Sequence, residues 1–320
     1  MSDYKELLGL DIEAKSADPT DVITGEVWFN TSTNQFKYKK PDGANTWTTS
    51  GNLIVGRRLA GQGTIGIQTS ALCISGLDGY ASKTNNESYN GSSWTELGDV
   101  NASRYLASAF GADATAAIFC GGFGPSTGTT ANESWNGSSW TEVNDLNTGR
   151  NYSVGAGIQT AGLVFGSSSS NEVESWDGTN WTEVGDTNAA RYSSAGAGVQ
   201  TSALHFGGAN PTTGSALCES WNGSSWTEVG DLNTARKELA GAGASNTSAL
   251  AFSGGPNGPT QTESWNGSSW TEVNDMNTGQ TMAAGAGTQT LALVFGGGFG
   301  SAHNTEEFSP VDGTQVVDDA

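Results

Sequence analysis

The chain has 320 residues, of which 35 % are hydrophobic, and it contains 46 glycines but only 13 lysines and arginines together. Its formal net charge of −20 argues against direct nucleic-acid binding, because proteins bind phosphate backbones mainly through lysine and arginine. A chain rich in Gly, Ser, Thr and Asn favours short strands and tight turns over long helices. We therefore expect an all-β protein.

Residues 1–16 are charged and lack a continuous apolar stretch, and no apolar run elsewhere approaches the length of about 18 residues that a membrane-spanning helix needs. We expect no signal peptide and no membrane insertion. Cys73, Cys120 and Cys218 form no C-x-x-C pair and are expected to be buried free thiols.

The first 54 residues differ in composition from the rest, because five of the seven lysines lie there. Pro19 and several Asp, Ser and Thr residues argue against a stable helix past Ile12, so 1–24 is expected to be a mobile or partner-ordered leader. Residues 25–53 predict three short strands, with turns at 30–34 and 41–43. We expect a domain boundary after residue 54, with a second domain over 55–320.

From residue 90 onward the chain is an internal repeat. The unit NGSSWTE occurs at 90–96, 136–142, 222–228 and 266–272, with a fifth copy, DGTNWTE, at 177–183. The unit tryptophans are about 44 residues apart, a period typical of β-propeller blades. We expect these tryptophans to pack between blades.

One repeat, taken from residue 133, predicts four strands. ESW and WTEV flank Asn136-Gly137, a hairpin signal of a primed turn with positive φ at both residues. A loop with the pattern D-x-N-x-x-R follows, and then a small-residue strand that we place innermost, where Gly and Ala allow close backbone approach. The repeat ends in an apolar strand followed by a Gly-Gly turn.

Four-stranded sheets of this kind bury their faces by stacking in a closed ring. Six blades fit the sequence in two registers. In the first register, 306–317 forms the outer hairpin of the last blade. In the second, 36–50 supplies the outer hairpin of the blade begun by 282–297, so that both termini close the ring. A seventh blade would lack its innermost strand.

The order of small strand, apolar strand with Gly-Gly, loop, aromatic strand and Trp strand resembles the Kelch repeat over residues 55–317. The matching glycine pairs are 121–122, 207–208, 254–255 and 296–297, and the matching tryptophans run from Trp94 to Trp270; Arg104, Arg150, Arg191 and Arg236 fall where Kelch repeats place an arginine. Ser167 after Gly166, Gln280 in the last arginine position and a shorter aromatic-to-Trp interval depart from the pattern. The resemblance implies a six-bladed Kelch-like β-propeller of four-stranded blades, with a short N-terminal extended attachment segment.

A second resemblance concerns 25–53, which is similar to a segment GxxWxNTxTxxxxxxxGxxW found in tail fibres and other virion proteins of bacteriophages. It is matched by Gly25, Trp28, Asn30, Thr31, Thr33, Gly43 and Trp47. The resemblance implies a virion protein made in the bacterial host cytoplasm, on the tail rather than the capsid. We expect Trp28, Phe36, Tyr38 and Lys39 to attach it to other virion proteins; homo-oligomerisation is left open.

The residues that could carry catalysis are few. His205 stands at a core position equivalent to Val164, His303 lies in a loop, and two separated histidines make no zinc or copper site. The repeated Asp and Glu residues are expected to cap loops or to pair with Arg, Thr or backbone groups. A sialidase-like enzyme is the alternative, because SWDGTNW around Asp177 distantly resembles an Asp-box turn. We predict no catalytic residue, no cofactor and no metal.

The loops that vary between repeats are the better candidates for contact. They cover 123–132, 209–216, 256–262 and 299–304, and the residues chosen from them are Phe123, Asn132, Asn210, Thr213, Asn257, Thr260, Phe299 and His303. Such loops suit multivalent contact with a host-surface glycan or protein. The sequence thus predicts a non-enzymatic, tail-associated structural protein; a capsid decoration protein without host binding is the alternative from the same class.

Overall fold

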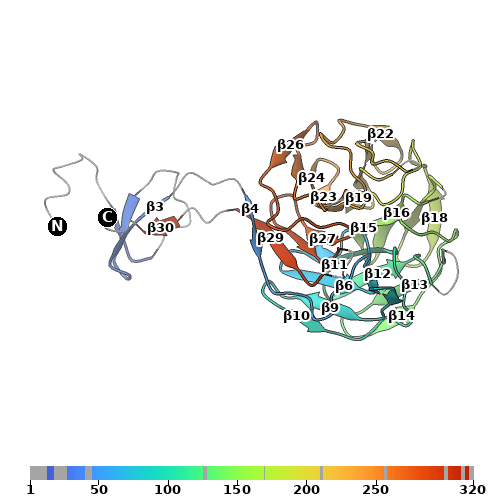
Figure 1. The fold of residues 1–320 in the computed structure, drawn as a ribbon, viewed down its shortest axis with the longest axis horizontal. Coiled ribbons are helices and arrows are strands. Elements are labelled where there is room, and N and C mark those ends of the chain that lie inside the picture. The colour runs from blue at the N-terminus through green and yellow to red at the C-terminus, as the bar shows by residue number, and fades with distance from the viewer. Residues whose placement is uncertain are drawn as a thin grey trace. The chain divides into compact units, whose positions relative to one another are not determined.

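The computed structural model describes residues 13–17, 27–39, 45–124, 128–168, 170–209, 212–255, 258–298, 302–310 and 314–316. Within them all regular structure is β-strand (Figure 1). The chain divides into a larger compact unit, Thr46–Ser309, and a smaller one formed by Met1–Asn45 together with Pro310–Ala320. The prediction of an all-β protein is confirmed.

The larger unit consists of six four-stranded antiparallel sheets arranged as blades around a central axis (Figure 1). Blade 1 contains β5 (Gly66–Ile67), β6 (Ser70–Ile74), β9 (Asn86–Tyr89) and β10 (Trp94–Glu96); blade 2 contains β11 (Ser108–Asp113), β12 (Ala116–Cys120), β13 (Asn132–Trp135) and β14 (Trp140–Glu142); blade 3 contains β15 (Val154–Ile158), β16 (Ala161–Phe165), β17 (Val173–Trp176) and β18 (Trp181–Val184); blade 4 contains β19 (Ala195–Val199), β20 (Ser202–Phe206), β21 (Cys218–Trp221) and β22 (Trp226–Glu228); blade 5 contains β23 (Ala240–Ser245), β24 (Ser248–Phe252), β25 (Thr262–Trp265) and β26 (Trp270–Val273); blade 6 contains β27 (Ala284–Gly287), β28 (Ala292–Phe295), β29 (Thr305–Ser309) and β4 (Thr46–Thr49). The predicted order of strands within a blade is confirmed.

The small-residue strands line the axis, as predicted, because larger side chains would not fit between neighbouring blades. A Cβ atom added at Gly196 would lie 2.7 Å from the ring of Phe165, and one at Gly241 would lie 2.6 Å from the ring of Phe206. Each of these rings belongs to the second strand of the preceding blade. Glycine on one inner strand therefore makes room for an aromatic ring from the neighbouring blade.

The unit tryptophans pack between blades, as predicted. Their exposed fractions are only 5–6 %, and four of the five contact a phenylalanine of the preceding blade. The exception is Trp140, which lies in one hydrophobic cluster with Ile74 of blade 1. The ring centroids of Phe165 and Trp226 are 5.1 Å apart, and those of Phe206 and Trp270 are 5.0 Å apart. Such aromatic pairs contribute to stability beyond the apolar area that they bury.

The turn between the two outer strands differs from the predicted primed turn. In NGSS at 136–139 only Gly137 has positive φ, 91°. The Oδ1 atom of Asn136 instead accepts hydrogen bonds from the backbone N–H groups of Ser138 and Ser139, each at 3.0 Å. The asparagine therefore acts as the cap of an Asx turn within a four-residue loop.

The ring closes with strands from both ends of the larger unit. β4 pairs with β29 in antiparallel register, with Trp47 opposite Phe308, so Trp47 takes the place of the unit tryptophan in blade 6. Each predicted register was half right: 305–309 supplies the third strand and 46–49 supplies the fourth. The structure also corrects the predicted domain division, because 46–54 belongs to the propeller and 310–320 to the smaller unit.

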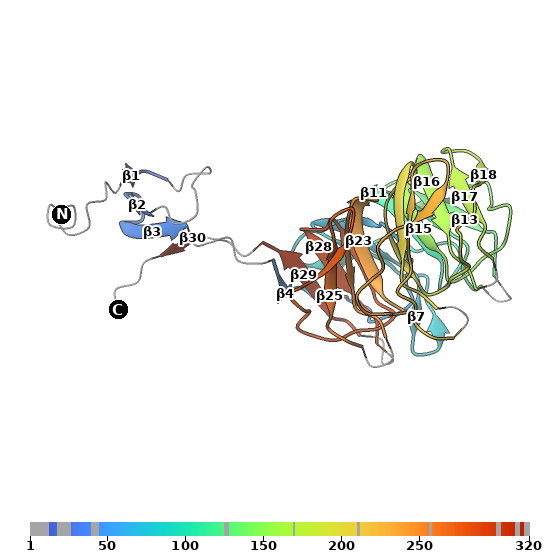
Figure 2. The same ribbon diagram turned by 90° about the horizontal axis from the view of Figure 1, so that it is seen from above.

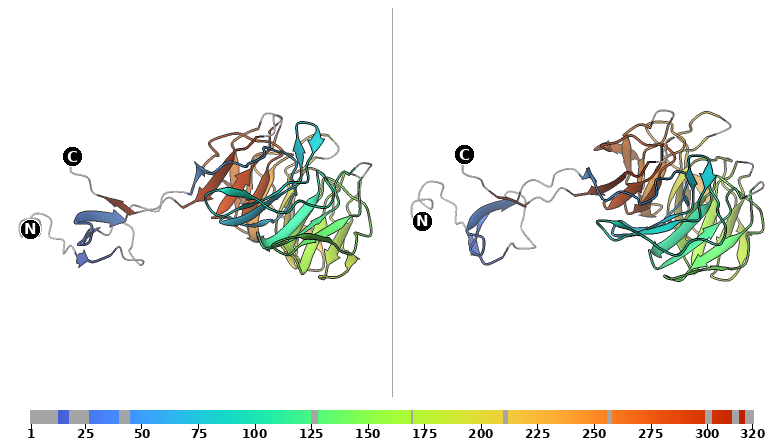
Figure 3. Two further views of the ribbon diagram at one scale, coloured as in Figure 1. Left: turned by 90° about the horizontal axis from the view of Figure 1, so that it is seen from below. Right: turned by 60° about the horizontal axis from the view of Figure 1, so that its bottom comes forward.

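The two ends of each blade define two faces of the propeller. The connections from second to third strand and from blade to blade emerge on one face, which we call the loop face; the short hairpins emerge on the other (Figure 2). In blade 1 the second-to-third connection carries an additional hairpin, β7 (Leu77–Asp78) and β8 (Ala81–Ser82), which projects from the ring in Figure 3. The loop face therefore carries most of the variable sequence.

The smaller unit contains the sheet β1-β2-β3-β30. β1 (Glu13–Lys15) pairs in parallel with β2 (Val27–Asn30), β2 pairs antiparallel with β3 (Gln35–Lys39), and β3 pairs antiparallel with β30 (Thr314–Val316). The predicted three strands over 25–53 are confirmed, but the third is β4 of the propeller. Of the predicted leader, 13–15 forms a strand, and 1–12 and 18–24 lie outside the described residues.

Candidate functional site

The D-x-N-x-x-R segment joins each blade to the next by hydrogen bonds. Asn188, which follows blade 3, donates from its backbone N and its Nδ2 to Oε2 of Glu219 in blade 4, at 2.6 and 2.9 Å. Its Nδ2 also lies 3.3 Å from the carbonyl of Trp226. Equivalent contacts are made by Asn101, Asn147, Asn233 and Asn277. The motif therefore serves contact between blades.

The arginine of this segment forms a buried ion pair with the same glutamate, and so does Arg57, which stands at the corresponding position before blade 1. The pairs, with their nitrogen-to-oxygen distances, are Arg57–Glu87 at 2.7 Å, Arg104–Glu133 at 2.7 Å, Arg150–Glu174 at 2.5 Å, Arg191–Glu219 at 2.8 Å and Arg236–Glu263 at 2.9 Å. Their side chains are at most 3 % exposed. The prediction that the glutamates pair with Arg or backbone groups is confirmed, and these arginines are not placed to clamp a substrate carboxylate.

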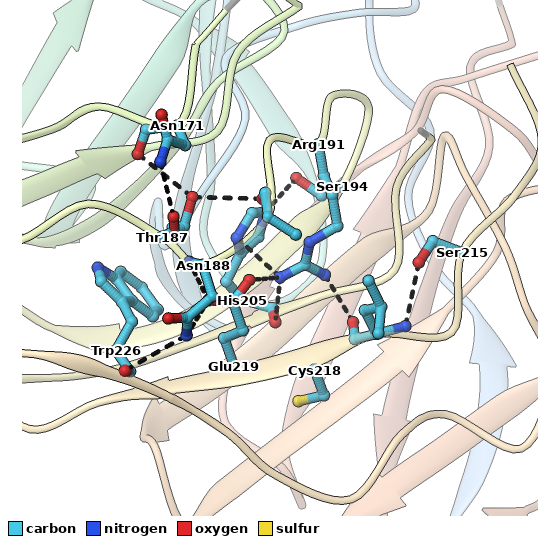
Figure 4. A network of polar contacts seen from close by, with 12 residues as sticks. Asn171, Thr187, Asn188, Arg191, Ser194, His205, Ser215, Cys218, Glu219 and Trp226 are labelled. Atoms are coloured by element: carbon cyan, nitrogen blue, oxygen red, sulfur yellow. Dashed lines mark hydrogen bonds and ion pairs between the residues drawn. The ribbon is translucent and has the colours of Figure 1, made fainter. Parts of the chain in front are cut away.

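His205 extends this network in blade 4 (Figure 4). Its Nδ1 lies 3.2 Å from a guanidinium nitrogen of Arg191, and its Nε2 lies 2.7 Å from Oγ of Ser194. Because arginine can only donate, Nδ1 accepts and Nε2 carries the proton. Burial, and then the charge of Arg191, lower the pKa of His205 well below its ordinary value of 6.5, so the imidazole is neutral. The predicted role as a core strand residue is confirmed.

The three cysteines are buried, and Asp177 forms its hydrogen bonds within its own turn. Cys73, Cys120 and Cys218 are buried free thiols, as predicted, and burial raises the pKa of Cys120 and of Cys218 to about 12. Asp177 accepts from the backbone N–H groups of Asn180 and Thr179, which lower its pKa. Its carboxylate is thus engaged within its own turn.

The predicted contact residues lie in different environments. Thr213 and His303 are exposed, while Phe123 and Thr260 are partly buried. Asn132 is only 1 % exposed and begins β13, where its Nδ2 donates to the carbonyl of Asn144 at 3.0 Å. The prediction of Asn132 as a contact residue is therefore wrong, because the variable loop ends one residue earlier. Asn210, Asn257 and Phe299 lie outside the described residues.

The predicted attachment residues all belong to the sheet of the smaller unit. Trp28 is fully buried, so its prediction as a direct attachment contact is corrected to a core position. Phe36 is partly buried, and its ring centroid is 5.0 Å from that of Phe29. Tyr38 and Lys39 belong to β3, and their side chains lie outside what the structure describes.

Sequence reasoning missed a ring of strained residues on the loop face. Two positions after each arginine or its equivalent, a non-glycine residue has a φ between 52° and 58°, a region that such residues rarely adopt. We call this set the mouth ring; its members are Leu59, Leu106, Tyr152, Ser193, Glu238 and Met282. The sequence did contain a signal for the mouth ring. The residue at this position varies in its chemistry among repeats that are otherwise nearly identical.

The backbone of the mouth ring forms a hydrogen-bonded belt. Each of five N–H groups donates to the carbonyl of the preceding member: Leu59 to Met282 at 3.0 Å, Leu106 to Leu59 at 3.1 Å, Tyr152 to Leu106 at 2.9 Å, Glu238 to Ser193 at 2.7 Å and Met282 to Glu238 at 3.0 Å. These bonds fix the backbone independently of the side chains. The side chains are therefore free to differ from blade to blade.

The central channel below the mouth ring is filled by the chain itself. Backbone atoms of Gln62 and Thr64 bond to the inner strands β11 and β15, with Gly155 N donating to Gln62 O and Thr64 N donating to Gly155 O, both at 3.0 Å. The space left along the axis here is about 10 Å³. The mouth ring surrounds a cavity of about 20 Å³ with Gln62 in its wall, room for about one water molecule. A larger ligand would therefore bind on the mouth rather than pass through it.

Four aromatic rings form a row on this face, which we call the aromatic row: Tyr105, Phe123, Tyr152 and Tyr192. Neighbouring ring centroids lie 5.4 Å apart for Tyr105 and Phe123, 6.1 Å for Phe123 and Tyr152, and 5.4 Å for Tyr152 and Tyr192. All four side chains are partly buried. Glu238 of the mouth ring accepts a hydrogen bond from Oγ1 of Thr281 at 2.9 Å. The row thus crosses three blade junctions beside an oriented carboxylate.

The described residues contain no cluster of three or more His, Cys, Asp or Glu side chains that could hold a metal ion. In the same part of the chain, no helix has the length and apolarity required to cross a membrane. The residues of the mouth ring and the aromatic row offer stacking surfaces and hydrogen-bond acceptors, which is the chemistry of a binding site.

No protein-family model and no curated protein sequence matches this chain. The solved structure of YjhT matches it with a TM-score of 0.64 at 13 % sequence identity, over 83 % of this chain and 99 % of YjhT. At that identity the likeness shows the fold alone. Together with the six four-stranded antiparallel sheets, it shows that the larger unit is a six-bladed Kelch-like β-propeller.

Proposed function

We propose that this protein is a non-enzymatic structural component of a bacteriophage particle, and that it binds a saccharide of the host surface on the loop face of its propeller. The virion assignment is supported by the sequence of 25–53, whose Trp28 forms the buried centre of a small sheet. The binding assignment is supported by the mouth ring and the aromatic row. The smaller unit would attach the protein to other virion proteins.

The aromatic row is the observation that carries the saccharide proposal. Flat, partly exposed rings provide rigid contact area at a low cost in conformational entropy, and the apolar C–H faces of sugar rings stack on them. The carboxylate of Glu238, oriented by Thr281, would accept hydrogen bonds from sugar hydroxyl groups. An acidic site in a chain of net charge −20 favours a neutral or amino sugar over a sialylated or sulfated one.

The same residues argue against a glycan-processing enzyme. A glycosidase needs two carboxyl groups facing one bond. Five of the six glutamates at the blade junctions are buried in ion pairs, the sixth, Glu306, is also buried, and Glu238 is the one carboxylate of the mouth ring. The arginines that a sialidase would use are likewise buried at those junctions. We therefore favour binding without turnover.

Binding of the full chain to immobilised host cells and to an array of neutral, amino and acidic saccharides tests the proposal. Tyr192→Ala should weaken saccharide binding about tenfold, equivalent to about 1.4 kcal/mol, while leaving the melting temperature within a few degrees. Tyr80→Ala is the matched control, because Tyr80 is 98 % exposed on the hairpin between β7 and β8. Equal binding by both variants, or no binding by the wild type, would contradict the saccharide proposal.

Immunogold electron microscopy of purified particles, with antibody to the propeller, tests the virion assignment separately. Gold at the tail tip or fibres supports attachment to the tail, and gold over the head supports the alternative of capsid decoration. Particles without gold would contradict a virion role of either kind. Release of sugar from any glycan by the wild type, with loss in Glu238→Gln, would support the enzymatic alternative.

A further inference from the structure

The junction before blade 6 differs from the other five in lacking an arginine. Gln280 occupies the arginine position there and is 3 % exposed, facing a blade whose Glu306 is 1 % exposed. Among the described residues, neither Nε2 nor Oε1 of Gln280 has a hydrogen-bond partner. A buried amide without partners is costly, so this junction is the place in the propeller where a partner is most needed.

The other junctions show which atoms surround the guanidinium that is missing here. Nη1 of Arg104 donates to the carbonyls of Gly121 and Ala131 at 3.1 and 2.6 Å. Nη1 of Arg191 donates to the equivalent carbonyls of Gly207 and Leu217 at 3.0 and 2.6 Å. In both cases Nη2 donates to Oε1 of the glutamate. Each guanidinium therefore lies between two carbonyl oxygens and one carboxylate oxygen.

The same cradle is present in blade 6. Gly296 and Asn304 hold the positions of Gly121 and Ala131, directly after the second strand and directly before the third. The N–H of Gly296 donates to the carbonyl of Asn304 at 3.0 Å, as that of Gly121 donates to Ala131 at 3.0 Å. The carboxylate of Glu306 and the amide oxygen of Gln280 join the carbonyl oxygens of Gly296 and Asn304. Oxygen atoms of four residues thus surround the position that a guanidinium occupies at the other junctions. We call Gln280, Gly296, Asn304 and Glu306 the sixth seam.

Glu306 accepts hydrogen bonds from N–H groups but lacks the positively charged partner that its counterparts have. It accepts from the backbone N and Nδ2 of Asn277 at 2.8 and 3.0 Å and from the backbone N of Thr278 at 2.8 Å. Within the described part of the chain it forms no ion pair, although a buried charge requires a countercharge. One positive charge is therefore missing.

We infer that the sixth seam binds a monovalent cation, of the kind of Na⁺ or K⁺, in place of the sixth guanidinium. Glutamine has two fewer non-hydrogen atoms than arginine, which leaves a space of roughly one water molecule, about 30 Å³. Oxygen ligands suit hard cations, but Ca²⁺ prefers six to eight of them and Mg²⁺ retains its waters. One carboxylate and three neutral oxygens match a single positive charge.

Thermal unfolding of the full chain at constant ionic strength tests this inference, with tetramethylammonium, sodium or potassium chloride as the salt. The melting temperature of the wild type should be about 2–5 °C higher in the sodium or potassium salt. Gln280→Arg is the matched variant, since it restores the residue that the other junctions carry. It should melt at the same temperature in all three salts.

Two outcomes of the thermal unfolding measurement would overturn the inference. Equal melting temperatures of the wild type in all salts would mean that water alone occupies the sixth seam, and an equal salt effect in Gln280→Arg would place the cation elsewhere. Crystals of the wild type grown in rubidium chloride give a second measurement that does not depend on the variant. An anomalous peak within bonding distance of Glu306 Oε1 and the Gly296 carbonyl is expected, and its absence would also refute the site.

Discussion

The junctions between blades and the mouth ring lie two residues apart in sequence and follow opposite rules. At the junctions the side chains are repeated and the structure depends on their identity, as for Arg191 with Glu219. In the mouth ring the backbone is repeated and the side chains differ, as for Ser193 beside Glu238. The repeat therefore preserves the side-chain interactions where blades join, and it allows different side chains around the mouth of the channel.

The comparison is tested most strongly by changing one residue of each kind in the same segment. Arg191→Leu leaves Glu219 buried without its partner and should lower the free energy of unfolding by about 3–5 kcal/mol. Ser193→Leu should change it by less than about 1 kcal/mol, because Leu59 and Leu106 already occupy equivalent mouth-ring positions. Chemical denaturation of both variants measures the difference. Similar losses in the two variants would contradict the contrast.

The chain segment in the channel below the mouth ring should tolerate substitution poorly, in contrast to the mouth ring itself. Gly63 has a φ of 140°, and a Cβ atom there would lie 2.2 Å from the carbonyl oxygens of Ala109 and Gly155. Gly63→Ala should therefore cost about 2–4 kcal/mol. Gly124→Ala is the control, because nothing lies within 4 Å of its added Cβ. A variant as stable as the wild type would show that the chain segment in the channel is not held tightly.

His205 should make the blade 4 junction sensitive to pH. Its pKa is lowered by burial and by Arg191, so the unfolded chain binds the proton more readily than the folded one. Stability is then complete above about pH 6.5 and falls with decreasing pH, by up to about 1.4 kcal/mol per pH unit. His205→Val should flatten this dependence between pH 6.5 and 5, whereas His303→Asn should not. Parallel curves for wild type and His205→Val would refute this role.

The smallest expected effect concerns one indole at a junction. Nε1 of Trp47 donates to Oγ1 of Thr262 at 3.0 Å, and Nε1 of Trp94 donates to Oγ1 of Thr305 at 2.9 Å. Trp226 packs in one cluster with Val173, which begins the equivalent strand, and its buried Nε1 has no partner among the described residues. Val173→Thr should supply the acceptor and raise stability by about 1 kcal/mol.

Thr262→Val is the reciprocal variant and should lower stability by a similar amount. Thermal unfolding of both variants measures the two effects. Destabilisation by Val173→Thr would mean that the added hydroxyl does not reach the indole of Trp226.

Much of the fold could be predicted because the repeat displays each strand several times. The small-residue strands, the hairpin at Asn136-Gly137 and the pairing of the glutamates followed from residue types alone. The closing blade did not, because TWTT at 46–49 and TEEFS at 305–309 each resemble part of an outer hairpin. The two strands are far apart in sequence, so only tertiary pairing decides that both belong to one sheet.

Two smaller errors of the sequence-based prediction also have local structural causes. The predicted pair 254–255 is shifted by one residue: Ser253 has a φ of 67° and its carbonyl accepts from Arg236 at 3.0 Å, so Ser253 holds the first glycine position. The mouth ring could not be predicted from propensity, because Leu, Tyr and Met rarely adopt positive φ. Neighbouring blades impose that conformation through the backbone belt.

The closure of blade 6 also determines how force would travel through the chain. Thr46 and Ser309 lie opposite one another in the β4–β29 pair, and the chain crosses between the two units at 45–46 and again at 309–310. A load applied to the smaller unit thus enters the propeller through two covalent strands side by side. If a protease cut the first crossing, the second would remain, and the β3–β30 pair would still hold the severed segment. The connection is a double tether.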